Sequence, residues 1–264
     1  MTPPDRNDDD AAHRLIPLFI GFVILAVLTP LLPEISLDSA IADMVVRITD
    51  TGTWPQLVLV VAALTVVLVT RPGLEPRRGW IEASLVLGVM LVALAGNGLL
   101  NEHVVKPAFG VPRPNIAELA GAGLLGDDIP DGDSFYSLGG KGARRDVLAE
   151  RFALVPELGL SELVEAHWIH ETGFSFPSGH STAAVTLATF FAALGVWWLS
   201  GWRRQLAIFV IPLWAVLVVY SRPLLEVHTA VDVLAGAAAG VGWGLAAAWV
   251  VNRIANGGSR TLTE

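Results

Sequence analysis

Six ionisable side chains fall in three short stretches of the chain, and their types are suited to binding and transferring an anionic group. They are Lys106 and Arg113 in "KPAFGVPRP", His180 in "PSGH", and Arg222, His228 and Asp232 in "SRPLLEVHTAVD". The three cations suit an anion with several oxygens, because arginine offers a fork of donors and lysine a movable point charge. Phosphate is the simplest such anion.

The "PSGH" stretch, residues 177–180, adds further features of a phosphate site. Gly179 lets the backbone approach a ligand closely, and Ser178 offers a hydroxyl group. An apolar run follows at once, so a helix should begin here, and the free N–H groups at a helix start attract anions.

The two histidines could supply a nucleophile and an acid. His228, when neutral, can attack phosphorus, and His180 can protonate the leaving oxygen. We expect Asp232 to accept a hydrogen bond from the other ring nitrogen of His228, which would fix the tautomer and stabilise the cation formed. Because these two residues are four positions apart, we expect them to share a helix face.

Each of these residues also has an ordinary structural explanation. Lys106 and Arg113 could anchor helix ends at a membrane interface, and His180 could be an inert residue at a helix start. A histidine and an aspartate four residues apart are as common in structural hydrogen bonding as in catalysis. Such explanations do not account for all six residues together.

The elements that must position these residues are predicted to be membrane-spanning helices. The chain has 264 residues, of which 53% are hydrophobic and 16% charged, and its mean hydropathy is +0.58. These values are typical of a membrane protein. Apolar stretches suitable for an all-α bundle of six spans occur at about 15–32, 55–70, 80–100, 181–199, 205–220 and 230–251. The second and fifth are short and could instead be buried helices of a soluble protein.

Arginines in the short loops predict the orientation of these spans. The loop 33–54 carries Arg47 against four acidic residues, whereas loops on the other side hold Arg71, Arg77, Arg78, Arg203 and Arg204. Basic residues are nearly as numerous on one side as on the other overall, so the prediction rests on the short-loop bias. The acidic N-terminal stretch lacks a basic n-region, which favours a retained span over a signal peptide. We expect both termini inside and the three chemical stretches at the outer face.

Residues 107–176 separate the third and fourth spans and are rich in glycine, aspartate and arginine. We interpret this segment as an extramembrane insert without a core of its own, within one domain that covers residues 1–264. Its later part has helical spacing of apolar residues, which predicts short helices at the membrane surface. In the loop 33–54, a second surface helix is predicted by the spacing of Leu37, Ile41, Met44 and Ile48.

The three stretches fit K-x6-RP, PSGH and SR-x5-H-x3-D, and in this order they resemble the type 2 phosphatidic acid phosphatase superfamily. The resemblance implies a six-helix membrane phosphatase that works without a metal or cofactor. His228 would then be the nucleophile, Asp232 its partner and His180 the acid. The residues that would hold phosphate are Lys106, Arg113, Ser178, Gly179 and Arg222.

The stretches "DSFYSL", "VLAERFA" and "AHWIHETGFSFPSGH" further resemble the bacterial phosphatidylglycerophosphatase B family. That resemblance implies an enzyme of the bacterial inner membrane that acts on phosphatidylglycerophosphate, with its termini in the cytoplasm and its site facing the periplasm. The breadth of the superfamily extends to phosphatidate, diacylglycerol pyrophosphate and undecaprenyl pyrophosphate. An undecaprenyl pyrophosphate phosphatase is therefore the alternative, and the expected partners are the bilayer and a phospholipid or isoprenoid phosphate, with no nucleic acid.

Other residues and function classes fit the sequence less well. No cluster of carboxylates lies beside the motifs in the sequence, so the chemistry does not require a hard metal ion. We interpret Glu102 and Glu226 as interface residues or as residues that contact the site residues rather than the substrate. The chain has no cysteine, which excludes a thiolate nucleophile. A vanadate-dependent haloperoxidase would use a similar constellation but is soluble. A transporter or channel would not need PSGH together with a histidine and aspartate pair.

Overall fold

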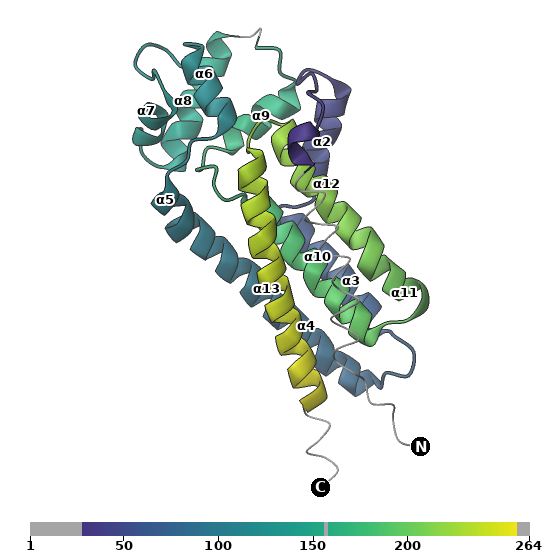
Figure 1. Ribbon diagram of the computed structural model, residues 1–264. Helices are drawn as coiled ribbons and strands as arrows, with labels where there is room; N and C mark the ends of the chain where they lie inside the picture. The colour runs from purple at the N-terminus through teal and green to yellow at the C-terminus, as the bar shows by residue number, and fades with distance from the viewer. Residues whose placement is uncertain (1–27, 156–157, 258–264) are drawn as a thin grey trace.

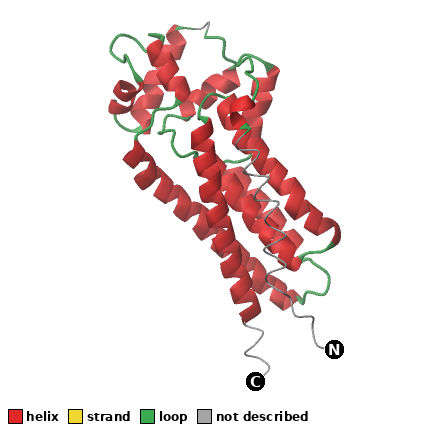
Figure 2. Ribbon diagram, viewed as in Figure 1, coloured by secondary structure: helices red, strands yellow, loops and turns green. Residues whose placement is uncertain are grey.

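The computed structural model describes residues 28–155 and 158–257, and within these ranges the regular structure is helical (Figure 1, Figure 2). The long helices of the bundle are α3 (Trp54–Val69), α4 (Pro76–Leu100), α10 (Gly179–Trp198), α12 (Ile211–Leu224) and α13 (Ala230–Gly257). The helix α4 is prolonged by the π-helical segment η2 (Asn101–Val105) and by α5 (Lys106–Phe109). The helix α11 (Gly201–Gln205) and the π-helical segment η3 (Leu206–Val210) lead into α12.

Shorter helices cover one end of the bundle (Figure 1). They are α2 (Ala40–Asp50), α6 (Pro114–Gly121), α7 (Gly132–Ser137), α8 (Lys141–Leu154) and α9 (Glu162–His170), with the 3-10 turn η1 (Thr29–Leu31) before α2. Four of these, α6 to α9, belong to the predicted insert. We call α2 and α6 to α9 the cap.

Five of the six apolar stretches predicted from the sequence correspond to helices of the bundle. The first, 15–32, lies largely outside the described residues. Within the described ranges, four helical segments have the length and hydropathy of membrane spans, namely 76–121, 179–198, 201–224 and 230–257. A fifth results if α2 and α3, bent by 62°, form one span. The all-helical membrane architecture is thus confirmed, with four or five candidate spans among the described residues.

The helices α10 and α13 pack very closely because α13 presents glycines to α10. A Cβ atom on Gly236, Gly240 or Gly244 would lie 2.5 to 2.7 Å from a backbone oxygen of α10 or of its N-terminal cap. Only a residue without a side chain fits such a contact. This contact holds the PSGH stretch against the start of α13, where the N–H of Ser178 donates to the carbonyl oxygen of Asp232 at 3.0 Å.

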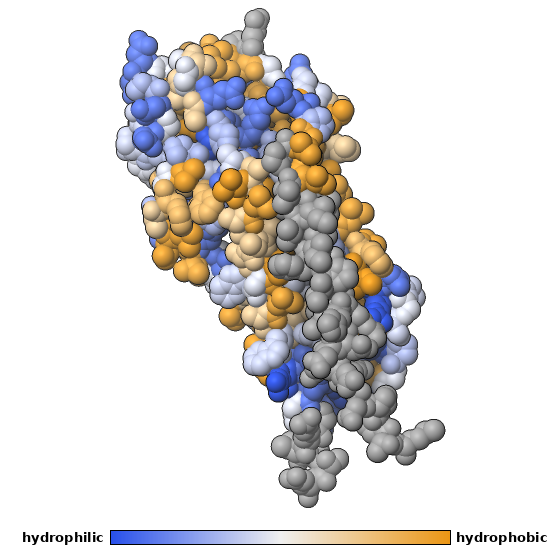
Figure 3. Space-filling view, viewed as in Figure 1, coloured by the Kyte–Doolittle hydropathy of each residue, from blue (hydrophilic) through white to orange (hydrophobic). Residues whose placement is uncertain are grey.

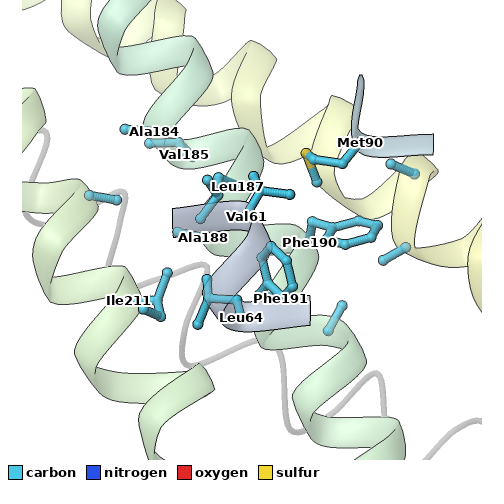
Figure 4. Packing of buried hydrophobic residues seen from close by; sticks show 14 of the residues in the cluster. Val61, Leu64, Met90, Ala184, Val185, Leu187, Ala188, Phe190, Phe191 and Ile211 are labelled. Carbon is cyan, nitrogen blue, oxygen red and sulfur yellow. The ribbon is translucent and has the colours of Figure 1, made fainter. Parts of the chain in front are cut away.

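Apolar side chains from α3, α4, α10 and α12 fill the centre of the bundle (Figure 4). The rings of Phe190 and Phe191 on α10 are buried there, beside Leu64 of α3 and Met90 of α4. On the face shown in Figure 3, apolar residues gather along the middle of the molecule and hydrophilic residues at its two ends. This distribution is the one expected of a bundle surrounded by lipid.

The insert contributes to a second apolar cluster, which it shares with α2 and with the loop that joins α12 to α13. Buried side chains from α6, α7, α8 and α9 form a cluster that includes Ile116, Phe135, Leu148 and Trp168. The short amphipathic helices bury these faces against one another, against α2 and against the loop that joins α12 to α13. The cap is therefore packed onto the end of the bundle where that loop lies.

The predicted surface helix in the loop 33–54 exists as α2, but it buries a different face. Its buried residues are Ala42, Val45, Val46 and Thr49, because α9 and α12 pack against α2. Ile41 and Met44, which belong to the predicted stripe, are 57% and 55% exposed. These two side chains give α2 an outward apolar face beside the bundle.

Candidate active site

The three sequence motifs meet where the cap joins the bundle. Lys106 begins α5, Arg113 directly precedes α6, and His180 is the second residue of α10. Arg222 lies in the last turn of α12, and Asp232 lies in the first turn of α13. These positions surround a cavity of about 220 Å³ lined by Glu102, Lys106, Arg113, Lys141, Arg145, His170, Glu171, Gly173, Gly179, His180 and His228. The predicted residues Ser178, Arg222 and Asp232 are buried and do not line it.

Arg113 is buried and held by contacts on three sides. Its Nε donates to the carbonyl oxygen of Gly173 at 2.8 Å, and its Nη1 donates to the carbonyl oxygen of Val227 at 3.1 Å. Its Nη2 pairs with Oε2 of Glu171 at 2.6 Å. A guanidinium fixed in this way needs little reorganisation when a phosphate group arrives.

The carboxylate of Glu171 bridges the two arginines of the site. Its Oε2 lies 2.6 Å from Nη2 of Arg113 and 3.1 Å from Nη2 of Arg222. Burial alone would raise the pKa of Glu171, but the charges of the two arginines outweigh it and hold the pKa well below its usual value. Glu171 is thus an anion that occupies arginine donors in the absence of phosphate.

Arg222 is fully buried on the far side of Glu171. Its Nη1 donates to Oγ1 of Thr49 on α2 at 2.7 Å and to Nε2 of His167 on α9 at 3.1 Å. Burial and the charge of Arg222 lower the pKa of His167 to about 3, so His167 is a neutral acceptor. Arg222 therefore ties the cap to α12, and its predicted contact with phosphate requires Glu171 to give way.

His228 precedes α13, which begins at Ala230, so the prediction that His228 and Asp232 share a helix face is wrong. Asp232 accepts the N–H of Thr229 at 2.7 Å and thereby caps the helix, which leaves His228 in the preceding loop. Its Nδ1 is 3.6 Å from Oδ2 of Asp232. The hydroxyl of Ser175 lies between them, 3.2 Å from Nδ1 and 2.5 Å from Oδ2.

The hydrogen bonds around His228 specify its tautomer. Ser175 has one hydroxyl hydrogen, which it donates to Asp232, so its oxygen accepts the hydrogen on Nδ1 of His228. On the other side of the ring, Nε2 lies 3.2 Å from Nη1 of Arg113, which can only donate. Burial, followed by the charges of Arg113, Arg222 and Lys106, holds the pKa of His228 well below its usual value. The Nε2 atom of His228 is therefore unprotonated, and its electron pair accepts a hydrogen bond from Arg113.

His180 is oriented by the start of α10. The hydroxyl of Ser178 caps this helix by accepting the N–H of Ser181 at 3.4 Å and its hydroxyl at 3.0 Å. Within the described residues, the buried Nε2 of His180 has no hydrogen-bond partner, and the residue lines the cavity. This nitrogen is available to a ligand. Because the hydroxyl of Ser178 serves as a cap, its contact with phosphate stays a prediction.

Several residues of the site were not found by sequence reasoning. Glu171 and Ser175 lie in "HETGFS", which Phe176 separates from PSGH, and the polar character of that stretch is a signal that could have identified them. Tyr136, in "DSFYSL", donates its hydroxyl to the carbonyl oxygen of Gly173 at 2.9 Å and so connects α7 to the segment that leads to PSGH. Thr49 and His167 carry no local signal, since only the tertiary packing of α2 and α9 brings them to Arg222.

The charged residue Glu102, interpreted from the sequence as an interface or supporting residue, lines the cavity itself. Its carboxylate lies 3.6 Å from Nζ of Lys106 and 2.5 Å from Nζ of Lys141. In the part of the chain that the structure describes, no group of three or more histidine, cysteine, aspartate or glutamate side chains could hold a metal ion. The absence of a metal from the reaction stays a prediction.

The class of protein is defined by three features: the order of the motifs, the helical bundle, and the cluster of cations with two histidines. The chain belongs to the PAP2 superfamily, whose family model matches residues 84–255. This confirms the family resemblance inferred from the three motifs.

Two relatives of this chain are both named phosphatidylglycerophosphatase B. Over 178 residues the chain is 35% identical to phosphatidylglycerophosphatase B of Escherichia coli (strain K12), a match that covers 66% of this chain and 64% of the relative. It is 28% identical over 210 residues to phosphatidylglycerophosphatase B of Haemophilus influenzae (strain ATCC 51907 / DSM 11121 / KW20 / Rd), which covers 78% of this chain and 77% of the relative. The match to the first protein thus spans slightly less than two thirds of that protein's length.

Proposed function

We propose that this protein is a lipid phosphatase that removes a terminal phosphate from lipids such as phosphatidylglycerophosphate through a phosphohistidine intermediate. The observation that carries the proposal is the unprotonated Nε2 of His228, a residue that lines one cavity with Arg113, Lys106 and His180. Membership of the PAP2 superfamily and the names of the two relatives support the same reaction and substrate class.

In the first step, Nε2 of His228 attacks phosphorus while the bond from phosphorus to the lipid oxygen breaks. His180 gives a proton to that oxygen, so the lipid leaves as an alcohol. The ring of His228 becomes cationic, and the carboxylate of Asp232 stabilises it through the hydroxyl of Ser175. No metal takes part in the proposed step.

In the second step, water attacks phosphorus, and the bond between phosphorus and Nε2 breaks. His180, which has lost its proton, takes one from the water. Arg113 and Lys106 face the oxygens on which charge accumulates in both steps, and removal of one such donor costs about 100- to 1000-fold in rate. The phosphate oxygens replace Glu171 as partners of Arg113 and Arg222.

The site is proposed to face the periplasm from the outer leaflet of the bacterial inner membrane. The arginines of the short loops support this orientation, because Arg203 and Arg204 lie on α11, at the end of the bundle opposite the cap (Figure 1). The helix α13 also ends on that side, which supports a cytoplasmic C-terminus. The cap and the cavity would then lie outside.

An isoprenoid pyrophosphate is the second candidate substrate, because the cavity continues from Arg113 to the basic residues Lys141 and Arg145 of α8. Phosphate release distinguishes the candidates. The purified protein should be assayed in detergent, with EDTA present, on phosphatidylglycerophosphate, phosphatidate and undecaprenyl pyrophosphate. We expect release from at least the first lipid. Release from none of the three would contradict the proposed function, and release that depends on added Mg²⁺ would contradict the proposed chemistry.

A further inference from the structure

Four cationic side chains line the cavity, two more than the sequence motifs supply, together with the carboxylates of Glu102 and Glu171. Lys141 and Arg145, both on α8 of the insert, line it together with Lys106 and Arg113. Neither of them belongs to the three motifs that define the reacting centre. A volume of about 220 Å³ corresponds to roughly seven water molecules, which is more than one phosphate group fills.

Lys141 is held over the cavity by the segment that leads to PSGH. The backbone oxygen of Lys141 accepts the hydroxyl of Thr172 at 3.2 Å, which ties the start of α8 to that segment. Its side-chain stem lies against Gly173, since a Cβ atom there would be only 2.9 Å from Cε of Lys141. The side chain is 42% exposed, so its ammonium group is accessible from the mouth of the cavity.

The carboxylate of Glu102 connects the two lysines of the cavity. One oxygen lies 2.5 Å from Nζ of Lys141 and the other 3.6 Å from Nζ of Lys106. Lys106 faces the phosphate that reacts, so the group next to that phosphate along a substrate comes close to Lys141. A second phosphate can replace Glu102 as the partner of Lys141.

Arg145 follows Lys141 by one helical turn and lies on the same face of α8. Its Nε donates to the carbonyl oxygen of His170 at 3.1 Å, which orients the guanidinium beside the cavity. The first turn of α8 contains no acidic residue. Because the N-terminus of a helix is itself electropositive, an anionic ligand would relieve the repulsion among these cations.

We propose that Lys141 and Arg145 bind the second phosphate of a lipid that carries two. In phosphatidylglycerophosphate this is the phosphodiester, and in an isoprenoid pyrophosphate it is the phosphate that stays on the lipid. The inference rests on the proposed function, because it assumes that the first phosphate occupies the site beside His228. Lys141 and Arg145 are then specificity residues that favour such lipids over phosphatidate.

The test compares phosphatidylglycerophosphate with phosphatidate in the same mixed micelles. We expect the double variant Lys141→Gln/Arg145→Gln to raise KM for phosphatidylglycerophosphate about tenfold and to change KM for phosphatidate less than about twofold. The single variant Lys141→Arg, which keeps a positive charge and an intact Arg145, should retain most of the difference in KM between the two lipids. Arg151→Gln is the matched control, since Arg151 lies on the same helix but pairs with Asp128 at 2.8 Å, away from the cavity.

Equal KM changes for both lipids, or no change for either, would overturn the inference. Either result would leave the proposed function standing, because KM can be compared only if the unmodified protein releases phosphate from both lipids. If the unmodified protein releases phosphate from neither of these lipids nor from undecaprenyl pyrophosphate, the proposed function itself fails. The two failures are therefore distinguishable in one set of assays.

Discussion

The Nε2 atom of His228 lies 3.2 Å from Nη1 of Arg113. Because an arginine side chain can only donate, this contact requires an unprotonated Nε2. The residue that would hold phosphate thus also keeps the nucleophile in its reactive form. We expect phosphate oxygens to take the Nη donors of Arg113 in place of His228 and Glu171, while the bonds to the carbonyl oxygens of Gly173 and Val227 stay, which makes the electron pair of Nε2 available for attack.

The relay through Ser175 should contribute to the rate more than to binding. Ser175→Ala removes the hydroxyl that joins Nδ1 of His228 to Asp232, and the direct distance of 3.6 Å is too long for a good hydrogen bond. We expect kcat to fall about 10- to 100-fold with KM changed less than about threefold. Ser137→Ala, on the surface of α7, is the control.

Asp232→Asn should also lower kcat with little change in KM. The double variant Ser175→Ala/Asp232→Asn should have a kcat only slightly below that of either single variant. Steady-state kinetics on the three variants measures this coupling. If the fold-losses of kcat in the two single variants multiply in the double variant, Ser175 and Asp232 act independently.

Glu171 should compete with phosphate for the arginines of the site. Glu171→Gln leaves the buried guanidiniums of Arg113 and Arg222 without their shared anion, so we expect a lower melting temperature in detergent. Vanadate or inorganic phosphate should then raise the melting temperature of this variant by more than that of the unmodified protein, because each replaces the lost anion. Equal shifts in the two proteins would argue against competition. Glu150→Gln, on the exposed face of α8, serves as control.

Acid should destabilise the fold partly through His167. Its pKa is about 3 in the folded protein because of burial and the charge of Arg222, against about 6.5 when exposed. Below pH 6.5 the unfolded chain binds a proton that the folded chain does not, so stability falls between about pH 6.5 and pH 3. From pH 7.5 to pH 5 this loss is on the order of 2 kcal/mol.

His167→Gln keeps an acceptor for Arg222 but cannot be protonated. The fall in melting temperature from pH 7.5 to pH 5 should therefore be smaller than in the unmodified protein, by about 4 °C. An equal fall in both proteins would show that His167 is not the group that titrates.

The contact between α10 and α13 should control activity as well as stability. Gly236→Ala would bring a Cβ atom within 2.5 Å of the carbonyl oxygen of Ser178 and force the PSGH stretch away from Asp232. We expect a lower melting temperature and at least about a tenfold loss of kcat/KM. Gly242→Ala on the same helix meets open space, so both quantities should stay unchanged. Equal behaviour of the two variants would contradict the role given to this contact.

The sequence predicts the bundle well because each apolar stretch carries its own signal. The helices α3, α4, α10 and α13 follow the predicted spans within a few residues at most ends, although α4 continues beyond Leu100 into η2 and α5. It predicts the cap less well, because short helices depend on tertiary partners. The buried face of α2 is an example, since packing against α9 and α12, and not the local pattern, decides that Val45 is buried and Met44 exposed.

The sequence likewise predicts some residues of the site and misses those that depend on tertiary contacts. Spacing and residue type identify Lys106, Arg113, His180 and His228, all of which the fold brings to one cavity. The pairing of Glu171 with both arginines joins the end of the insert to its start and to α12, and no local pattern encodes it. The start of α13 at Ala230 likewise depends on the Asp232 cap, which leaves His228 outside the helix.

Trapping of a phosphoenzyme tests the central claim most directly. With a good leaving group, such as p-nitrophenyl phosphate, the first step does not need an acid, whereas the second step still needs His180 as base. His180→Ala should therefore accumulate a phosphorylated protein whose label is labile in acid and stable in base. We expect His228→Ala to show no label and no appreciable turnover. Label on a residue other than His228, or continued turnover by His228→Ala, would contradict the account.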